Sequence, residues 1–413
     1  MNTIEQALKV KHAAKYINRA TTEQKNKILT SIKEILLSSK DEILEQNKKD
    51  IEAAKNNGMP EHLIDRLTLN DDRIVSMALA IDELIHLVDP VSEVVSGWTR
   101  PNGLKIEKIR VPIGVVGIIY EARPNVSVDA ATICIKSGNA VLLRGGKEAI
   151  KTNTILVELM KKAINKNGVS SDIVELITDT TRESANEMMK MHGILDVLIP
   201  RGSAGLINSV ASNSNVPVIE TGTGNCHIYV DDSADIDMAV DIAVNAKTSR
   251  PSVCNAAESL VVHKDIASLF LNKLKGEFDR YGVELVGCRD SKKILPDIEL
   301  ATDDDYYAEY LGYKMSVKIV NCLDEAVEHI NKYSSKHSEA IITSNYKSAE
   351  YFLQTIDSAA VYVNASTRFT DGNEFGLGAE IGISTQKLHA RGPMSIRELT
   401  TQKFIIRGNG QVR

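Results

Sequence analysis

The sequence predicts an α/β protein with two doubly wound domains and a small β element. Short, nearly continuous apolar runs alternate with stretches of helical periodicity, a pattern typical of parallel sheets covered by helices on both faces. An Asn-Gly turn between alternating residues interrupts this pattern once. With 413 residues, the chain is too long for a single hydrophobic core, so more than one domain is expected.

The N-terminal part is predicted to be helical. Residues 21–24 (Thr-Thr-Glu-Gln) and 39–42 (Ser-Lys-Asp-Glu) have the form of capping boxes, in which side chains satisfy the first backbone N–H groups of a helix. Two apolar stripes at helical spacing are interpreted as core. They are Ile28, Leu29, Ile32, Ile35 and Leu36, and later Ile74, Met77, Ala78, Ile81, Leu84 and Ile85.

The middle of the chain supplies the predicted strands. Residues 98–111 alternate around Pro101-Asn102-Gly103 and predict a hairpin that projects as an arm. Short apolar runs then predict the strands of a first parallel sheet. These runs are residues 115–119, 141–143, 174–177, 197–199 and 218–219. A second series follows, with a strand at 228–230, a helix from Asp235 to Ala246 and a strand at 260–262, which indicates a domain boundary near residue 228.

Three loops that follow predicted strands have the composition of anion sites. They read Tyr-Glu-Ala-Arg-Pro-Asn at 120–125, Arg-Gly-Gly-Lys at 144–147 and Pro-Arg-Gly-Ser-Ala-Gly at 200–205. Ligands of open parallel sheets bind beyond the carboxyl ends of the strands, where glycines and helix starts admit phosphate. The loops therefore indicate a phosphorylated dinucleotide or an anionic substrate, although each alone is also typical of a tight connection.

Composition argues against several other classes of protein. The net charge of -6 disfavours a nucleic-acid or anionic membrane partner. The N-terminus lacks the pattern of a signal peptide and no apolar run approaches the length of a membrane span, so a cytoplasmic location is expected. Neither the cysteines nor the histidines have metal-ligand spacing, so no metal is expected.

Cys254 is the strongest single candidate for chemistry. It lies in the polar stretch 250–258 (Arg-Pro-Ser-Val-Cys-Asn-Ala-Ala-Glu), between the predicted helix and the strand at 260–262. A cysteine presented in such a loop is suited to acyl chemistry through sulfur. The alternative from these residues alone is a small, inert, half-buried side chain.

Three long strings carry a resemblance to a known family. Residues 218–227, 251–258 and 363–385 resemble the gamma-glutamyl phosphate reductases, a divergent branch of the aldehyde dehydrogenase superfamily, and the likeness covers nearly the whole chain. The resemblance implies an aldehyde dehydrogenase-like fold. It implies an NADPH-binding domain (1–97 and 112–228), a catalytic domain (229–390) and an oligomerisation element (98–111 and 391–413).

The resemblance also implies an activity. It is the NADPH-dependent reduction of L-glutamate 5-phosphate to L-glutamate 5-semialdehyde, with release of phosphate, in proline biosynthesis. Cys254 would form a thioester that hydride then reduces. Glutamate 5-kinase is the implied upstream enzyme, and the implied assembly is a homodimer or a higher homo-oligomer.

The catalytic residues follow from the same resemblance. Glu220 matches a general-base glutamate, but acyl-phosphate reduction needs no activated water, so a positioning or structural role stays open. The oxyanion-stabilising asparagine of the superfamily aligns with Ala122. The Cys254 backbone N–H and Asn125 are therefore the candidate donors.

The resemblance also implies residues that bind the cofactor and the substrate, at positions that match those of the superfamily. Arg144 and Lys147 match positions near the adenosine ribose, where basic residues favour NADPH over NADH. Gly202 and Ser203 match the pyrophosphate turn, and Glu309 matches the glutamate that holds the nicotinamide ribose, the alternative being a solvated helix charge. The arginines expected to bind the substrate's carboxylate and phosphate are Arg123, Arg250 and Arg368.

Two other functions remain open at the level of sequence. A phosphate-independent aldehyde dehydrogenase would use Glu220 to activate water and would oxidise its substrate. A non-catalytic metabolite-binding protein would retain the fold without turnover.

Overall fold

A computed structural model describes residues 2–413, which divide into two compact units. The first segment of unit 1 ends at Thr221, and unit 1 also contains Gly376–Gly382 and Met394–Arg413. Unit 2 comprises Gly222–Phe375 and Ile383–Pro393. The first division between the units therefore lies before strand β7 (Cys226–Val230). The boundary predicted from the sequence, near residue 228, would instead cut that strand.

The N-terminal part of unit 1 is helical, as predicted. Its helices are α1 (Thr3–Ile17), α2 (Thr22–Ser38), α3 (Lys40–Asn56), α4 (Glu61–Leu67) and α5 (Asp71–His86). The capping box of Thr21 and Gln24 at α2 is confirmed. The second predicted box is wrong, because Ser39 makes no side-chain cap hydrogen bond. Ser39 ends α2 and begins α3 at once, and its φ of -111° and ψ of 24° are not the extended conformation of a capping residue.

A four-stranded parallel sheet forms the centre of unit 1, with strand order β5-β4-β3-β6. The strands are β3 (Val115–Tyr120), β4 (Ala140–Arg144), β5 (Val174–Leu176) and β6 (Val197–Arg201). The helical segments between and after them are α6 (Asn125–Lys136), η1 (Lys147–Ala149), α7 (Ile150–Lys166), η2 (Ser171–Ile173), α8 (Arg182–Met189) and α9 (Ala204–Asn213). The predicted strand at 218–219 is reduced to a single bridge between Val218 and Leu198, because the preceding Pro217 has no N–H to extend the ladder.

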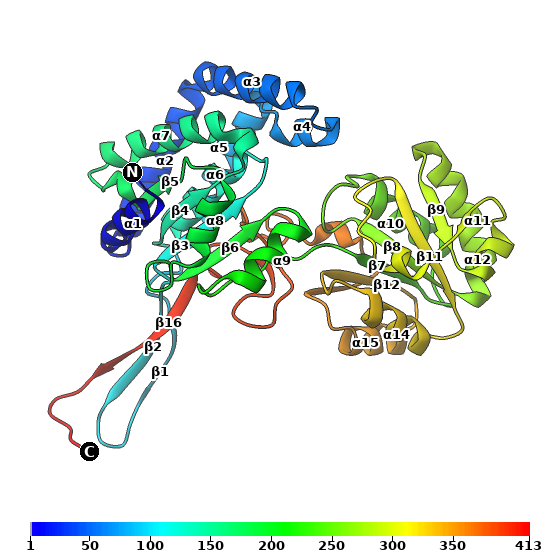
Figure 1. Ribbon diagram of the computed structural model, residues 1–413. Helices are drawn as coiled ribbons and strands as arrows, with labels where there is room; N and C mark the ends of the chain where they lie inside the picture. The colour runs from blue at the N-terminus through cyan, green and yellow to red at the C-terminus, as the bar shows by residue number, and fades with distance from the viewer. Residues whose placement is uncertain (1) are drawn as a thin grey trace. The chain divides into compact units, whose positions relative to one another are not determined.

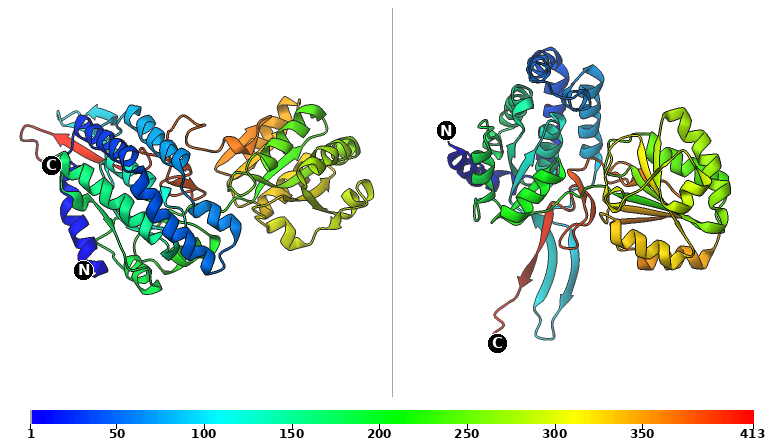
Figure 2. Two further views of the ribbon diagram at one scale, coloured as in Figure 1. Left: turned by 90° about the horizontal axis from the view of Figure 1, so that it is seen from above. Right: turned by 45° about the vertical axis from the view of Figure 1, so that its right-hand side comes forward.

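The predicted hairpin is confirmed as part of a three-stranded antiparallel arm. Strands β1 (Val94–Thr99) and β2 (Lys105–Pro112) pair with each other, and β16 (Thr400–Arg407) pairs with the other edge of β2. Gly103 in the turn has a φ of +87°, a conformation that favours glycine. The arm extends away from the helices of unit 1 (Figures 1 and 2).

Unit 2 is built on a seven-stranded parallel sheet with strand order β10-β9-β11-β8-β7-β12-β13. Besides β7, its strands are β8 (Ala257–His263), β9 (Glu284–Gly287), β10 (Glu299–Leu300), β11 (Lys314–Val320), β12 (Ser338–Ile342) and β13 (Ala360–Val363). Its helices are α10 (Ile236–Thr248), α11 (Lys264–Tyr281), α12 (Arg289–Ile294), α13 (Asp303–Tyr307), α14 (Leu323–Tyr333), α15 (Tyr346–Thr355) and the 3-10 turn η3 (Thr367–Phe369). Two short strands, β14 (Gly382–Ser384) and β15 (Gly392–Met394), pair separately.

Both faces of this sheet are covered, as a doubly wound fold requires (Figure 1). In β7, Ile228 and Val230 pack in one core with residues of α10 and α11. Tyr229, between them, packs in the other core with residues of α14 and α15. Alternate side chains of a strand point to opposite faces, so this register confirms the predicted α/β architecture.

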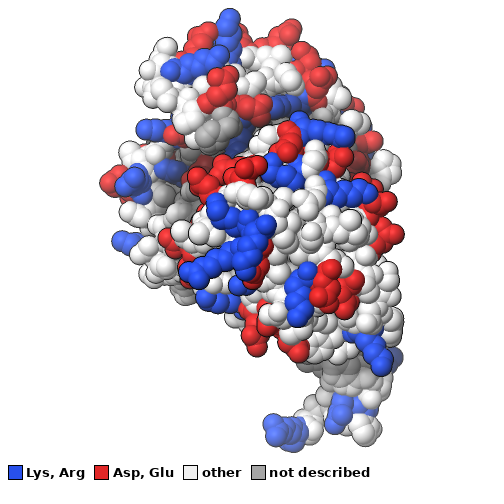
Figure 3. All heavy atoms as spheres, turned by 90° about the vertical axis from the view of Figure 1, so that its right-hand side faces the viewer, with Lys and Arg blue, Asp and Glu red and all other residues white. Residues whose placement is uncertain are grey.

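The surface charges have mixed signs, as expected for a chain with 49 Lys and Arg residues and 55 Asp and Glu residues. Lys and Arg side chains are interspersed with Asp and Glu side chains on the face shown in Figure 3. None of the helices described in residues 2–413 combines the length and apolarity that a membrane span needs.

Candidate active site

Cys254 lies in a short loop between two elements of unit 2, as predicted. Helix α10 ends at Thr248 and β8 begins at Ala257, so the loop leads into the amino-terminal end of a buried strand. The Ala256 N–H donates to the Val253 carbonyl over 3.0 Å, which closes the turn around the cysteine. The Cys254 side chain is partly buried.

The backbone of Cys254 is held by two residues that precede or begin β7. The Cys226 thiol donates to the Cys254 carbonyl oxygen over 3.2 Å. A Cβ on Gly224 would lie 1.5 Å from the same oxygen, so only glycine fits this close approach. The Gly224 N–H in turn donates to Glu309 Oε1 over 2.7 Å. The backbone of Cys254 is therefore fixed independently of its side chain.

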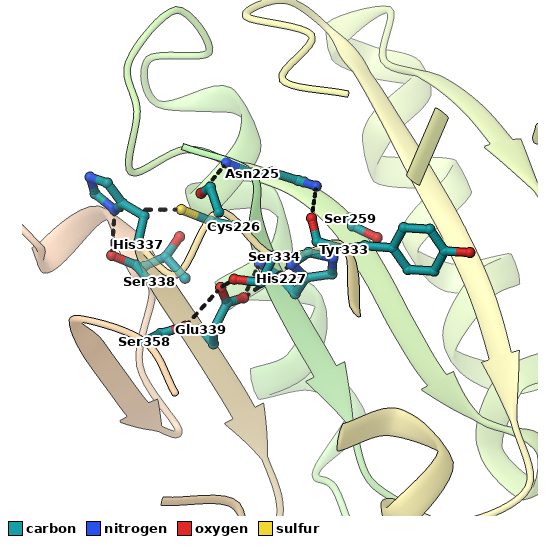
Figure 4. Close-up of polar contacts among 12 residues, drawn as sticks. Asn225, Cys226, His227, Ser259, Tyr333, Ser334, His337, Ser338, Glu339 and Ser358 are labelled. Atoms are coloured by element: carbon teal, nitrogen blue, oxygen red, sulfur yellow. Dashed lines mark hydrogen bonds and ion pairs between the residues drawn. The ribbon is translucent and has the colours of Figure 1, made fainter. Parts of the chain in front are cut away.

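Polar side chains in and next to β7 and β12 form two separate buried groups (Figure 4). Cys226 faces His337, whose Nδ1 is 2.8 Å from Ser338 Oγ. His227, on the opposite face, contacts Glu339 Oε2 through its backbone N–H and its Nδ1. Neighbours on a strand point in opposite directions, so Cys226 and His227 do not share a site. No group of His, Cys, Asp or Glu within the described part of the chain is arranged to hold a metal ion.

A buried ion pair closes the base of the cysteine loop. Lys247, near the end of α10, pairs with Glu258, at the start of β8, and both side chains are fully buried. The Leu311 N–H donates to the other carboxylate oxygen over 3.3 Å. Burial lowers the pKa of Lys247 and raises the pKa of Glu258 to about 7. The pair ties together the two elements that flank Cys254.

Two of the predicted arginines lie with Cys254 in unit 2. Arg368 donates from Nε to Ser249 Oγ over 3.1 Å and from Nη1 to Asn255 Oδ1. Its pKa is lowered by burial and then by the charge of Arg250. Among the described residues, neither arginine forms an ion pair with a carboxylate. Positive charge without a carboxylate partner next to a cysteine loop is suited to binding an anion.

The third predicted arginine and four of the five predicted cofactor residues belong to unit 1, whereas Glu309 belongs to unit 2. Arg123 lies in the loop after β3. Arg144 ends β4, and its Nη2 donates to the carbonyls of Thr180 and Thr181 over 2.7 Å each, so it braces the turn before α8. Lys147 begins η1 and is exposed.

The predicted pyrophosphate turn carries an anionic side chain of the protein itself. Ser203 caps α9, and its N–H and Oγ both donate to the Glu121 carboxylate over 2.8 Å. A helix start with unpaired N–H groups attracts negative charge. The carboxylate shows that the turn at Gly202 and Ser203 accepts an anionic group, so these residues fit a phosphate.

The remaining predicted residues have defined local settings. Asn125 begins α6 and donates from Nδ2 to Asp129 Oδ2 over 2.9 Å, and burial raises the pKa of Asp129 to about 6. Glu220 is partly buried next to Thr221, the last residue of the first segment of unit 1. Glu309 follows α13 rather than lying on it, so the alternative of a solvated helix charge is wrong.

Sequence comparison then places the chain. A profile of the aldehyde dehydrogenase family matches residues 2–286, more than half of the chain. The chain belongs to the aldehyde dehydrogenase family. Its relatives within the family include gamma-glutamyl phosphate reductases of Clostridium perfringens, 58% identical over 98% of both chains. A second, from Halothermothrix orenii, is 57% identical over 99% of this chain and 98% of its own.

A solved structure agrees with the aldehyde dehydrogenase family assignment. The crystal structure of gamma-glutamyl phosphate reductase from Thermotoga maritima superposes with a TM-score of 0.97, at 50% identity over the whole of both chains. The family fold expected from the sequence is therefore confirmed. Enzymes of the aldehyde dehydrogenase family are oxidoreductases that use nicotinamide cofactors and small-molecule substrates.

Proposed function

We propose that this chain reduces L-glutamate 5-phosphate to L-glutamate 5-semialdehyde in proline biosynthesis, with NADPH as reductant and release of phosphate. The names of relatives at 57–58% identity over nearly the whole chain support this activity. The observation that carries the proposal is the setting of Cys254, with Arg250 and Arg368 close by and without carboxylate partners. Glutamate 5-kinase would supply the substrate.

Cys254 begins the proposed reaction. Its thiolate attacks the carbonyl carbon of the acyl phosphate, a C–S bond forms, and the C–O bond to phosphate breaks. The leaving phosphate carries the bonding electron pair and takes a proton from solvent. Because the substrate has a phosphate and an α-carboxylate, the arginine pair is suited to anchor one of its anionic ends while Cys254 reacts.

The second half of the reaction returns the thiol to its starting state. A bound nicotinamide cofactor supplies the hydride that reduces the thioester carbonyl. The Cys254 backbone N–H is the proposed donor to the oxyanion that forms there, and Asn125 is the second candidate. Breaking the C–S bond then releases the aldehyde and restores the thiolate. No step activates water, so we assign Glu220 a positioning role.

We assign cofactor binding to five residues. Gly202 and Ser203 would hold the pyrophosphate, and Arg144 and Lys147 would favour the 2'-phosphate that distinguishes NADPH from NADH. Glu309 is proposed to bind the nicotinamide ribose. In the structure its carboxylate already accepts one N–H donor, from Gly224, over 2.7 Å.

Glu121→Gln is expected to strengthen NADPH binding. The Glu121 carboxylate uses the Ser203 N–H and hydroxyl, so it competes with a cofactor phosphate for the start of α9. Removing this charge is expected to lower the Kd for NADPH by about three- to tenfold. The measurement is a fluorescence titration of NADPH without substrate.

Glu23→Gln is the matched control, because Glu23 is an exposed carboxylate in the first turn of another helix of unit 1. It is expected to leave the Kd unchanged. An unchanged or higher Kd for Glu121→Gln would show that no phosphate competes for the start of α9.

We further propose that a second copy of the chain covers the arm, giving a homodimer or a larger homo-oligomer. The arm exposes several large apolar side chains that a solitary chain would leave in water. They are Val94, Val95, Trp98, Phe404 and Ile406. Trp98 and Phe404 come from β1 and β16 and contact each other edge to face, so they form one apolar surface across the strands.

Phosphate dependence of the reverse reaction tests the proposed function. The purified protein is mixed with NADP and L-glutamate 5-semialdehyde, and NADPH formation is followed with and without inorganic phosphate. NADPH is expected to form only when phosphate is present, because phosphate must attack the thioester to release the product. Formation at the same rate without phosphate would favour a water-using dehydrogenase, and no formation at all would favour a binding protein.

A further inference from the structure

Asn255, the residue after Cys254, is buried and uses all of its side-chain polar atoms. Its side chain is 4% exposed. Nδ2 donates to the carbonyls of Arg368, over 3.2 Å, and Thr370, over 2.8 Å, while Oδ1 accepts from Arg368 Nη1. Its backbone carbonyl accepts from Thr367 Oγ1 over 2.8 Å. The cysteine loop is thereby joined to η3, more than a hundred residues further along the chain.

These contacts require an amide in one orientation. The two carbonyls only accept hydrogen bonds and the guanidinium only donates them. The NH2 group of Asn255 must therefore face Arg368 O and Thr370 O, which leaves the amide oxygen for Arg368 Nη1. An aspartate of nearly the same shape would lose both donated bonds and would add a negative charge beside the guanidinium.

The guanidinium of Arg368 is held from both sides of the cysteine loop. Ser249, five residues before Cys254, accepts from Nε, and Asn255, one residue after it, accepts from Nη1. Both partners are neutral oxygens, so they orient the guanidinium without cancelling its charge. Within the part of the chain that the structure describes, no carboxylate lies at ion-pair distance from it.

We propose that Asn255 is a positioning residue that aims the Arg368 guanidinium at an anionic group of the substrate, a phosphate or a carboxylate, bound at Cys254. The inference rests on the proposed function. Asn255 does not touch the substrate in this arrangement. It makes the nucleophile and the anion anchor a single rigid unit, so its contribution depends on the presence of Arg368.

The experiment measures the reverse reaction for Asn255→Ala, Asn255→Asp, Arg368→Ala and the double variant N255A/R368A. The KM values for inorganic phosphate and for L-glutamate 5-semialdehyde are determined separately, together with kcat. Asn255→Ala is expected to raise one of the two KM values by about tenfold, with kcat changed by less than about threefold. Asn255→Asp is expected to raise it further, because the new carboxylate pairs with Arg368. The KM that rises identifies the anion.

The double variant distinguishes a positioning role of Asn255 from a general destabilisation of the cysteine loop. If Asn255 acts through Arg368, N255A/R368A is expected to match Arg368→Ala alone, because the anchor that Asn255 aims is already gone. Ser249→Ala removes the hydroxyl that accepts from Arg368 Nε. Ser249 is exposed, and its substitution is expected to raise the same KM by a smaller factor. This variant keeps the proposal testable if Asn255→Ala fails to fold.

Asn139→Ala is the matched control, because Asn139 is a buried amide of unit 1 that bridges backbone groups of Gly114 and Leu399. It is expected to lower the melting temperature and leave both KM values unchanged. Unchanged KM values in Asn255→Ala or Ser249→Ala, or an effect of Asn255→Ala that adds to that of Arg368→Ala, would overturn the proposal. Failure of the proposed function would differ, because the wild type would then form no NADPH in response to phosphate.

Discussion

Cys254→Ala is expected to lower the rate of phosphate-dependent NADPH formation by at least about 10³-fold, with the fold intact. Alanine has no group that can form the thioester, whereas the contacts that fix the loop remain. Cys226 and Gly224 both contact the Cys254 backbone carbonyl, which the substitution leaves in place. The rate is followed through NADPH absorbance, and the melting temperature is measured beside it.

Cys322→Ala serves as the control for loss of a thiol, since Cys322 is an exposed cysteine of the same unit. Its rate is expected to stay within about twofold of the wild type. Iodoacetamide is expected to inactivate the wild type and Cys322→Ala alike. Turnover that survives in Cys254→Ala at a rate near the wild type would refute the thioester.

Lys247→Met is expected to reduce the free energy of unfolding by about 3–5 kcal/mol. Lys247 and Glu258 are fully buried, so removal of the ammonium leaves a buried carboxylate with only the Leu311 N–H as a partner. The loss is measured by urea unfolding. Lys273→Met, which breaks an exposed pair with Asp237, is the control and is expected to cost less than about 1 kcal/mol.

The same variant has an expected pH dependence. The pKa of Glu258 is about 7 in the folded protein against 4.5 ordinarily, so between these values the folded state binds more protons than the unfolded state. The stability that the protonated Glu258 contributes is therefore present at low pH and is lost as the pH rises through about 7. Without Lys247 the pKa of Glu258 is expected to rise further, because the ammonium no longer favours the carboxylate. The difference in the free energy of unfolding between wild type and Lys247→Met is therefore expected to shrink from pH 7 to pH 5. A deficit below 1 kcal/mol at pH 7 would contradict the assigned role of the pair.

Most of the regular structure could be predicted from the sequence because burial leaves a periodic trace. The strand at 115–119 is apolar on both faces, and the hairpin is marked by its Asn-Gly turn. Val218 and Ile219 have the same local composition but follow a proline, and they form only one bridge. Ser39 fails as a capping box because a second helix ends on it, which no local pattern indicates.

The site was predictable only in part. Cys254 is visible in the sequence because a polar loop surrounds it, whereas its supporting residues are defined by tertiary contacts. Glu121 reaches Ser203 across 82 positions, and Asn255 reaches Arg368 across 113. Contacts at such separations follow from the order of strands in a sheet and leave no periodicity. Glu121, Gly224 and Asn255 therefore lie in segments that the sequence marks, but their contacts could not be predicted from it.

The order of segments along the chain also constrains the sequence of folding events. Strand β16 completes the arm by pairing with β2, and the partners Arg407 and Lys105 are separated by all of unit 2. During synthesis the β1–β2 hairpin therefore exists for a long period with an unpaired edge, which is a template for intermolecular association. Unit 2 can complete its sheet during that period, since every strand of that sheet precedes β16. The β1–β2 hairpin is thus made early but is among the last elements of unit 1 to complete its strand pairing.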